Sequence, residues 1–270
     1  MQSYKVTEKI YLTKLMGQKG YSYSLSQKLL RKKDIKVNGK RINEDCQLSI
    51  GDKVDIFYDL TEELSIVYED ENILILDKRQ GIESVDLHKQ VLKKYPTAIF
   101  THRLDRNTGG LIIFALNQTS YQELYVALKE RVIKKYYLAR VYGCVEKDFD
   151  ELVAYCKKDS KNSFVSVFSN KVVGGKKMVT KYQVVNRFKN YTDLLVELVT
   201  GRTHQIRCHL SFIGHFILGD GKYGKESINK EMGYKVQQLF AYKIKFNFKE
   251  SSLSYLNDKI IQLNYQPLNK

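Results

Sequence analysis

The segment HRLDRNTGG at residues 102–110 places one carboxylate, Asp105, between Arg103 and Arg106. The two glycines that follow favour a tight turn before the apolar run that begins at residue 110. A neighbouring guanidinium favours the charged form of a carboxylate, and a charged carboxylate can serve as a nucleophile. The same residues also suit a structural Arg–Asp ion pair that ties a loop to a sheet, and residue chemistry alone favours that alternative.

A second polar segment, TGRTHQIRCHL at residues 200–210, combines two arginines with a predicted helix. Arg202 precedes that helix, where free backbone N–H groups attract an anion such as a phosphate, and Arg207 follows inside it. A capped amphipathic helix with ordinary surface arginines would give the same pattern. Asp220 lies between glycines in the loop at residues 214–224, which demands particular backbone geometry.

The histidines and cysteines do not indicate a metal site. His204, His209 and His215 are spaced by five and six residues, so they do not share one helical face as an HExxH pair would. The cysteines lie far apart in the sequence and form no CxxC pair. We therefore expect reduced thiols in a cytoplasmic protein at Cys46, Cys144, Cys156 and Cys208.

A basic cluster in residues 28–41 has one acid, Asp34, among seven cations. Such a cluster suits phosphate contacts, which dominate nucleic-acid affinity, although a solvated cationic surface would have the same composition. The cations of this cluster are Lys28, Arg31, Lys32, Lys33, Lys36, Lys40 and Arg41.

The overall composition favours a polyanionic partner. The 270 residues include 45 Lys and Arg against 30 Asp and Glu, a net charge of +15. This excess indicates nucleic acid first and an anionic membrane surface second. The chain contains no run of 18 apolar residues, and its first residues lack the apolar core of a secretory signal. The absence of P-loop and GxSxG motifs argues against nucleotide-driven and serine-hydrolase chemistry.

The elements that must position these residues are mostly strands. In the first part, a helix is expected at residues 24–33, strands at 35–37 and 41–42 joined by Asn38-Gly39, and a strand from residue 53. The polar residues 59–63 mark a candidate domain boundary. In the second part, strands are expected at residues 66–68, 73–76, 110–115, 135–143 and 192–199.

Two helices are expected in the second part. One covers residues 117–130 with a capping box at Thr119 and Gln122, and the other covers residues 203–214 with Thr203 as its N-cap. Strands outnumber helices without regular alternation. The pattern therefore predicts an α+β fold with a large mixed or antiparallel sheet.

The segment HRLDRNTGGLIIFA resembles the signature of the RluA/RluC/RluD-type pseudouridine synthases. Further segments resemble later motifs of that family in the same order, and the resemblance runs from about residue 66 to about residue 248. These segments are YEDENILILDKRQG at 68–81, KKYYLARVYG at 134–143, GGKKMVTKYQV at 174–184 and LVTGRTHQIRCHLSFIGHFILGDGKYG at 198–224. Residues 9–58 separately resemble an S4-type RNA-binding domain.

The resemblance implies a large, mostly antiparallel mixed sheet of the pseudouridine synthase type at residues 63–270, preceded by an S4-like α/β domain at 1–62. It implies a monomeric enzyme that isomerises uridine to pseudouridine in RNA, without a cofactor or a metal. Large-subunit (23S) ribosomal RNA is the expected substrate and tRNA the alternative. A non-catalytic RNA-binding or ribosome-assembly factor is the alternative from another class.

The resemblance also implies roles for individual residues. The family's catalytic aspartate matches Asp105, its active-site tyrosine matches Tyr137, and the basic partner of the aspartate matches Arg202. Arg103 matches an arginine that enters the space left by a flipped nucleotide, and Leu239 matches the apolar wall of the base pocket. Stacking on an aromatic face would recover part of the cost of flipping the nucleotide out of structured RNA.

Overall fold

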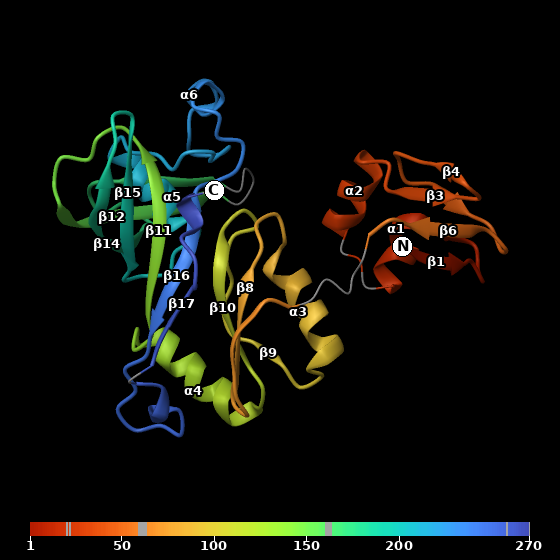
Figure 1. The fold of residues 1–270 in the computed structure, drawn as a ribbon, viewed down its shortest axis with the longest axis horizontal. Coiled ribbons are helices and arrows are strands. Elements are labelled where there is room, and N and C mark those ends of the chain that lie inside the picture. The colour runs from red at the N-terminus through yellow and green to blue at the C-terminus, as the bar shows by residue number, and fades with distance from the viewer. Residues whose placement is uncertain (20, 22, 59–63, 160–163, 258, 270) are drawn as a thin grey trace. The chain divides into compact units, whose positions relative to one another are not determined.

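The chain forms two compact units in a computed structural model (Figure 1). The described residues are 1–19, 21, 23–58, 64–159, 164–257 and 259–269. The smaller unit comprises Met1–Leu64 with Val85–Pro96, and the larger unit comprises Ser65–Ser84 with Thr97–Lys270. The boundary expected at residues 59–63 lies outside the described residues, so the division of the chain at residue 62 stays a prediction.

The smaller unit has a four-stranded antiparallel sheet, as counted over the described residues, with strand order β1-β6-β3-β4. Asn38 and Gly39 join β3 to β4 with φ angles of 49° and 80°, as a two-residue hairpin turn requires. The core includes Leu12, Met16 and Ile35. The elements of the smaller unit in this part of the chain are β1 (Gln2–Lys5), β2 (Ile10–Tyr11), α1 (Leu12–Gln18), α2 (Tyr23–Arg31), β3 (Ile35–Val37), β4 (Lys40–Arg41), β5 (Gln47–Leu48) and β6 (Lys53–Ile56). Helix α3 (Ser84–Lys94) starts at Ser84, the last residue of a segment of the larger unit, and its other residues belong to the smaller unit.

The larger unit is built on one extended sheet, with eleven strands among the described residues. Its main path runs β13-β12-β14-β15-β11-β16-β10-β8-β7, with β17 paired to β16 and β9 paired to β10. The strands are β7 (Ile66–Glu69), β8 (Ile73–Lys78), β9 (Ile99–Phe100), β10 (Gly109–Ala115), β11 (Lys134–Tyr142), β12 (Phe149–Asp159), β13 (Phe164–Phe168), β14 (Lys176–Arg187), β15 (Tyr191–Leu198), β16 (Leu239–Lys245) and β17 (Ile260–Gln262). The helices are α4 (Gln118–Lys129), α5 (Gln205–Phe212) and α6 (Glu226–Glu231), with 3-10 turns at Ser254–Leu256 and Pro267–Asn269.

Strands β10 and β16 form a parallel pair in the large sheet, and the other strand pairs of this sheet among the described residues are antiparallel. All seven residues of β10 are buried. Gly110 has a φ of 98°, and a Cβ there would lie 2.1 Å from the carbonyl oxygen of Ala241 on β16. A side chain at residue 110 would therefore push the two strands apart. The α+β fold with a mostly antiparallel mixed sheet is confirmed.

Two predicted helix starts are wrong. The N-cap of α4 is Asn117, whose side chain accepts a hydrogen bond from the Ser120 N–H, and not Thr119. Asparagine is among the best capping residues, and its amide oxygen reaches the third helical N–H. The N-cap of α5 is His204, in the left-handed conformation at φ 52°, and not Thr203. No helix among the described residues combines the length and apolar character needed to cross a membrane.

Candidate active site

Two side chains attach the segment before Asp105 to neighbouring elements. The Nε2 atom of His102 accepts a hydrogen bond from the backbone N–H of Ile113 in β10 at 3.1 Å. Burial, with a smaller contribution from nearby positive charge, lowers the pKa of His102 to about 3, so the ring stays neutral and able to accept. The Ser84 hydroxyl accepts from the Leu104 N–H at 3.0 Å and donates to its carbonyl at 2.8 Å.

A buried lysine attaches the segment after Asp105. The Nζ atom of Lys78 donates to the carbonyls of Arg79, Ile82 and Arg106 at 3.2, 2.9 and 3.2 Å. Burial lowers the pKa of Lys78 to about 8, although nearby carboxylates oppose the shift. Gly81 and Arg106 add reciprocal hydrogen bonds, one from each residue to the carbonyl of the other. The backbone on both sides of Asp105 is therefore fixed to the sheet and its loops.

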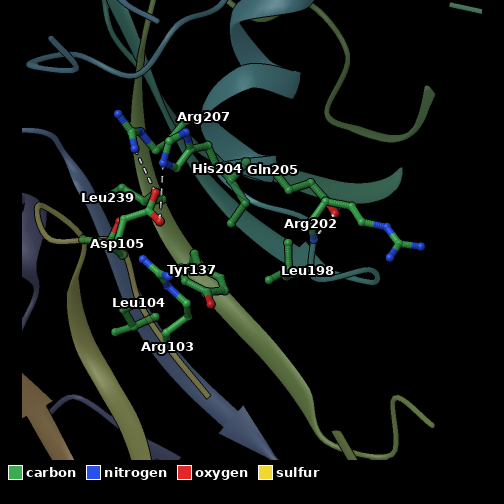
Figure 2. A pocket seen from close by; sticks show the side chains of 12 residues that line it. Arg103, Leu104, Asp105, Tyr137, Leu198, Arg202, His204, Gln205, Arg207 and Leu239 are labelled. Atoms are coloured by element: carbon green, nitrogen blue, oxygen red, sulfur yellow. Dashed lines mark hydrogen bonds and ion pairs between the residues drawn. The ribbon is translucent and has the colours of Figure 1, made fainter. Parts of the chain in front are cut away.

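The carboxylate of Asp105 forms an ion pair with Arg207 of α5, whose Nη1 donates to Oδ2 at 2.8 Å (Figure 2). The other side of the guanidinium is fixed by Asp220, through Nε to Oδ2 at 2.7 Å and Nη2 to Oδ1 at 3.0 Å. Burial alone would lower the pKa of Arg207, but the two carboxylates raise it above its usual value. The side chain of Asp220 is fully buried, whereas that of Asp105 is 21% exposed.

A histidine also approaches Asp105 from the start of α5. The Nε2 atom of His204 lies 4.0 Å from Asp105 Oδ1, and its Nδ1 lies 2.9 Å from the hydroxyl of Tyr223. That hydroxyl accepts the N–H of Val165 at 3.0 Å, so its own proton can be donated to Nδ1. Burial lowers the pKa of His204. In the sequence His204 stands out only as a candidate metal ligand, and its left-handed backbone conformation has no signature there.

Asp105 opens into a small pocket of about 80 Å³, which we call the Asp105 pocket. Tyr137 of β11 lines it and is only 5% exposed; burial and the charge of Asp105 raise its pKa above the usual value. Leu239 of β16 lines the pocket as well. Strand β11 pairs with both β15 and β16, which fixes the position of Tyr137 between Val196 and Ala241. The remaining lining residues include Arg103, Leu104, Thr108, Leu198, Arg202, Gln205 and Ile206.

Arg202 does not pair with Asp105, so this prediction is wrong and Arg207 takes that position. The Arg202 guanidinium extends away from Asp105 (Figure 2), and its Nε donates to the Lys177 carbonyl at 3.1 Å. The physical reason is that two hydrogen bonds hold Arg202 in the loop before α5, because its backbone N–H donates to the Gln205 side chain at 3.0 Å and its Nε to the Lys177 carbonyl. Arg202 therefore belongs to the preceding loop, whereas Arg207 lies on the helix face toward Asp105.

The cations of the predicted basic cluster lie together in the smaller unit, on α2, the following turn, β3 and β4. Lys36 and Arg41 lie 5.2 and 5.1 Å from the centre of the Phe57 ring. Arg41 is also 3.9 Å from Asp34, so part of its charge is compensated. Five of the seven cations are exposed, namely Arg31, Lys32, Lys33, Lys40 and Arg41, whereas Lys28 and Lys36 are half-buried.

Metal-ligating side chains do not gather in the described part of the chain, where no group of three His, Cys, Asp or Glu residues could hold an ion. The four cysteines, all described, are free thiols. The Asp105 pocket presents a carboxylate, its guanidinium partner, a neutral phenol and a histidine.

Comparison with known proteins gives the family. Residues 72–212 match the family described as RNA pseudouridylate synthase. An uncharacterized RNA pseudouridine synthase of Mycoplasma capricolum is 34% identical over 89% of this chain and 88% of its own length. The ribosomal large subunit pseudouridine synthase D of Buchnera aphidicola is 33% identical over 79% of this chain and 73% of its own.

A solved structure agrees with these relatives. Human RNA Pseudouridylate Synthase Domain Containing 1 superposes with a TM-score of 0.63 at 26% identity, over 76% of this chain and 84% of that one. The fold and the site thus define an enzyme that modifies RNA. The chain belongs to the RNA pseudouridylate synthase family of the RluA type and is an RNA pseudouridine synthase, an isomerase.

Proposed function

We propose that the protein isomerises specific uridines of large-subunit (23S) ribosomal RNA to pseudouridine, with Asp105 as the nucleophile. The observation that supports this most is the Asp105–Arg207 ion pair at a pocket lined by Tyr137 and Leu239. Arg207 places a positive charge beside the Asp105 carboxylate, and Asp220 keeps the guanidinium in position. One carboxylate oxygen, Oδ1, has no closer partner among the described residues than His204 at 4.0 Å.

The reaction needs one carboxylate and no net oxidation or reduction. Asp105 attacks either C1′ of the ribose or the uracil ring, and the bond between N1 and C1′ breaks. The base then rotates, a bond forms between C5 and C1′, and the bond between the nucleotide and Asp105 breaks to release the carboxylate. A proton leaves C5 and N1 gains one, so the atoms of uridine are conserved. Both routes place Asp105 within bonding distance of the nucleotide and require that water be excluded from the pocket.

The substrate must be flipped out of the RNA to reach this site, at a cost of a few kcal/mol. Stacking of uracil on Tyr137, about 1–3 kcal/mol, and apolar contact with Leu239 would offset part of this cost of flipping. The raised pKa keeps Tyr137 a neutral phenol at neutral pH, which suits a stacking surface. Arg103 is exposed at the rim of the pocket, and we propose that it occupies the space that the flipped nucleotide leaves.

We propose an S4-like RNA-binding domain at residues 1–62 and a catalytic domain at residues 63–270. The seven cations of the basic cluster at residues 28–41 support contacts to phosphates of structured RNA. We propose a monomer that acts in the cytoplasm, because uridines in ribosomal RNA are modified where the RNA is assembled. The support for ribosomal RNA over tRNA is that the relatives from Vibrio parahaemolyticus and Buchnera aphidicola are named ribosomal large subunit pseudouridine synthases C and D.

The RNA class is tested by carbodiimide-based mapping of pseudouridines in cellular RNA, with and without the gene. We expect the deletion to remove one or more pseudouridines from large-subunit ribosomal RNA and none from tRNA. Loss from tRNA alone would contradict the assignment of the RNA class. An unchanged map would contradict the catalytic function and favour an RNA-binding or ribosome-assembly factor.

A further inference from the structure

A second pocket, of about 410 Å³, adjoins the Asp105 pocket and shares Leu198 and Arg202 with it. We call it the Tyr125 pocket. It is formed by the end of α4, the start of β11, the segment before Asp105 and the loop before α5. Its lining includes Tyr125, Lys129, Arg131, Lys135, Leu198 and Arg202. Its volume is in the range of pockets that hold small organic ligands, about 300–1,000 Å³.

The described lining of the Tyr125 pocket carries four cations and no acid. Lys129, Arg131 and Arg202 surround it, and Lys135 is half-buried in its wall. Burial lowers the pKa of Lys135, and no carboxylate contributes to that shift. A pocket with several cations and no acid favours an anionic ligand.

The charges are separated across helix α4. Tyr125, Leu128 and Lys129 line the Tyr125 pocket, whereas Glu123 and Glu130 line a different pocket, together with Glu250 and Lys249. An ordinary surface of solvated charges would not require the basic and the acidic side chains of α4 to line different pockets. The basic edge of α4 therefore belongs to the side that continues into the Asp105 pocket.

The Tyr125 pocket also offers an aromatic face. The side chain of Tyr125 is 54% exposed, and Lys129 lies one helical turn further along the same face. An exposed ring beside cations is the arrangement with which proteins bind single-stranded nucleic acid, because each base has a face that can stack and each nucleotide has a phosphate.

The backbone conformation of Arg131 also supports a binding role for this pocket. Arg131 follows the C-cap of α4 with a φ of 64°, the left-handed conformation that favours glycine or asparagine. The Val132 N–H donates to the Ala127 carbonyl, as expected for a helix that ends in this way. Arginine at this position costs stability, and its side chain lines the Tyr125 pocket.

We propose that the Tyr125 pocket binds a nucleotide of the RNA strand that adjoins the target uridine. Tyr125 stacks on the base, and Lys129, Arg131 and Arg202 contact the phosphates. Arg202 lines both pockets, so it contacts the phosphate between the target uridine and its neighbour. This inference rests on the proposed function, because it takes the Asp105 pocket as the site of the uridine. It gives Arg202 a role in RNA binding in place of the ion pair with Asp105.

The first test measures binding without turnover, by fluorescence anisotropy of a labelled single-stranded oligouridine of twelve nucleotides with the full chain. We expect Tyr125→Leu to raise Kd about tenfold, because the stacking face is lost, and Tyr125→Phe to stay within about twofold of wild type. Both variants fold because the side chain is largely exposed. Equal Kd values for Tyr125→Leu and wild type, or no binding by wild type, would overturn the proposal.

The second test addresses the phosphate contacts. Lys129→Gln should reduce the slope of log Kd against log salt concentration by about 0.7, the value for one contact to a single strand. Lys249→Gln is the matched control, because it removes one charge from the other pocket and should leave the slope unchanged. Equal slopes in the wild type and Lys129→Gln would overturn the proposed contact.

The third test separates a binding role of Arg131 from a structural one. Arg131→Gly removes the charge and relieves the backbone strain, so we expect a higher melting temperature together with a higher Kd. A higher melting temperature with unchanged Kd would remove Arg131 from the proposed subsite.

Formation of pseudouridine by the wild type in ribosomal RNA transcripts is measured in parallel. Conversion by the wild type with equal Kd values in the Tyr125 series would overturn the subsite alone. If the wild type converts no RNA, the proposed function fails whatever the binding series shows.

Discussion

Arg207 donates a hydrogen bond to the carboxylate of Asp105 at 2.8 Å, although 102 residues separate the two in the sequence. The opposite edge of the same guanidinium makes a bidentate contact with the buried Asp220. This arrangement leaves Arg207 little freedom to turn, so Asp105 meets a positive charge whose position is fixed before the RNA arrives. Preorganised charge of this kind costs no rearrangement during the reaction.

The first prediction concerns the two arginines. We expect Arg207→Gln to lower kcat at least about 100-fold, because Asp105 loses the partner that positions its charge. Arg202→Gln should instead raise KM and leave kcat within a few-fold, since its guanidinium extends away from Asp105. Steady-state conversion of an RNA transcript measures both values. A larger loss of kcat in Arg202→Gln than in Arg207→Gln would contradict the assignment.

The choice between these arginines could not be made from the sequence. Both Arg202 and Arg207 lie in one short motif, and their directions depend on the residue at which α5 begins. The expected N-cap, Thr203, is one residue before the observed one, His204, whose backbone is left-handed at a φ of 52°. A shift of one residue turns a helical side chain by about 100°.

Other parts of the fold could be predicted from the sequence, because the patterns that indicate them are local. The apolar run at residues 110–115 gives the buried strand β10, and Asn38-Gly39 gives the hairpin turn. Strands β12, β13 and β14 were not predicted. In β12 the burial alternates, but the residue types do not follow it, because the apolar Phe149 and Val153 are exposed whereas Asp150 is half-buried. In β14 three successive buried residues, Met178–Thr180, interrupt the alternation.

The second prediction concerns the hydroxyl of Tyr137. Tyr137→Phe keeps the ring face, so RNA affinity should stay within about twofold. If the hydroxyl exchanges a proton with uracil, turnover should fall by about 100-fold. Single-turnover rates and equilibrium binding to the same RNA separate the two effects. Full turnover by Tyr137→Phe would show that Tyr137 contributes only a stacking surface.

The third prediction concerns pH. The folded pKa of His102, about 3, lies below the ordinary value of 6.5, so the unfolded chain binds a proton that the folded chain does not. Stability from this residue is therefore fully present above pH 6.5 and is lost as pH falls toward 3. Between pH 6.5 and 4.5 the wild type should lose about 2 kcal/mol more than His102→Gln, which keeps an acceptor for Ile113 without titrating.

Chemical denaturation of both proteins across this pH range measures the difference in free energy of unfolding. The groups that both proteins share cancel in that difference. Parallel loss of stability in the wild type and in His102→Gln would show that His102 does not carry the pH dependence.

The fourth prediction concerns the basic cluster of the smaller unit. Replacing the exposed Arg31, Lys32 and Lys40 with glutamine in the full chain should weaken binding to structured RNA. The slope of log Kd against log salt concentration should fall by about 2 to 3, close to one unit per phosphate contact. Lys147→Gln is a control, because Asp150 already compensates that charge at 2.9 Å. An unchanged slope in the triple variant would show that the cluster is an ordinary solvated surface without phosphate contacts.

The role of Asp105 as nucleophile is tested most directly by Asp105→Asn, in carbodiimide mapping of ribosomal RNA treated with the purified protein. Asp148→Asn is the matched control, since it removes a carboxylate that is 83% exposed and lies in the same unit. We expect pseudouridine from the wild type and from Asp148→Asn, and none from Asp105→Asn, with RNA affinity retained in all three. Equal conversion by Asp105→Asn and the wild type would contradict the role assigned to Asp105.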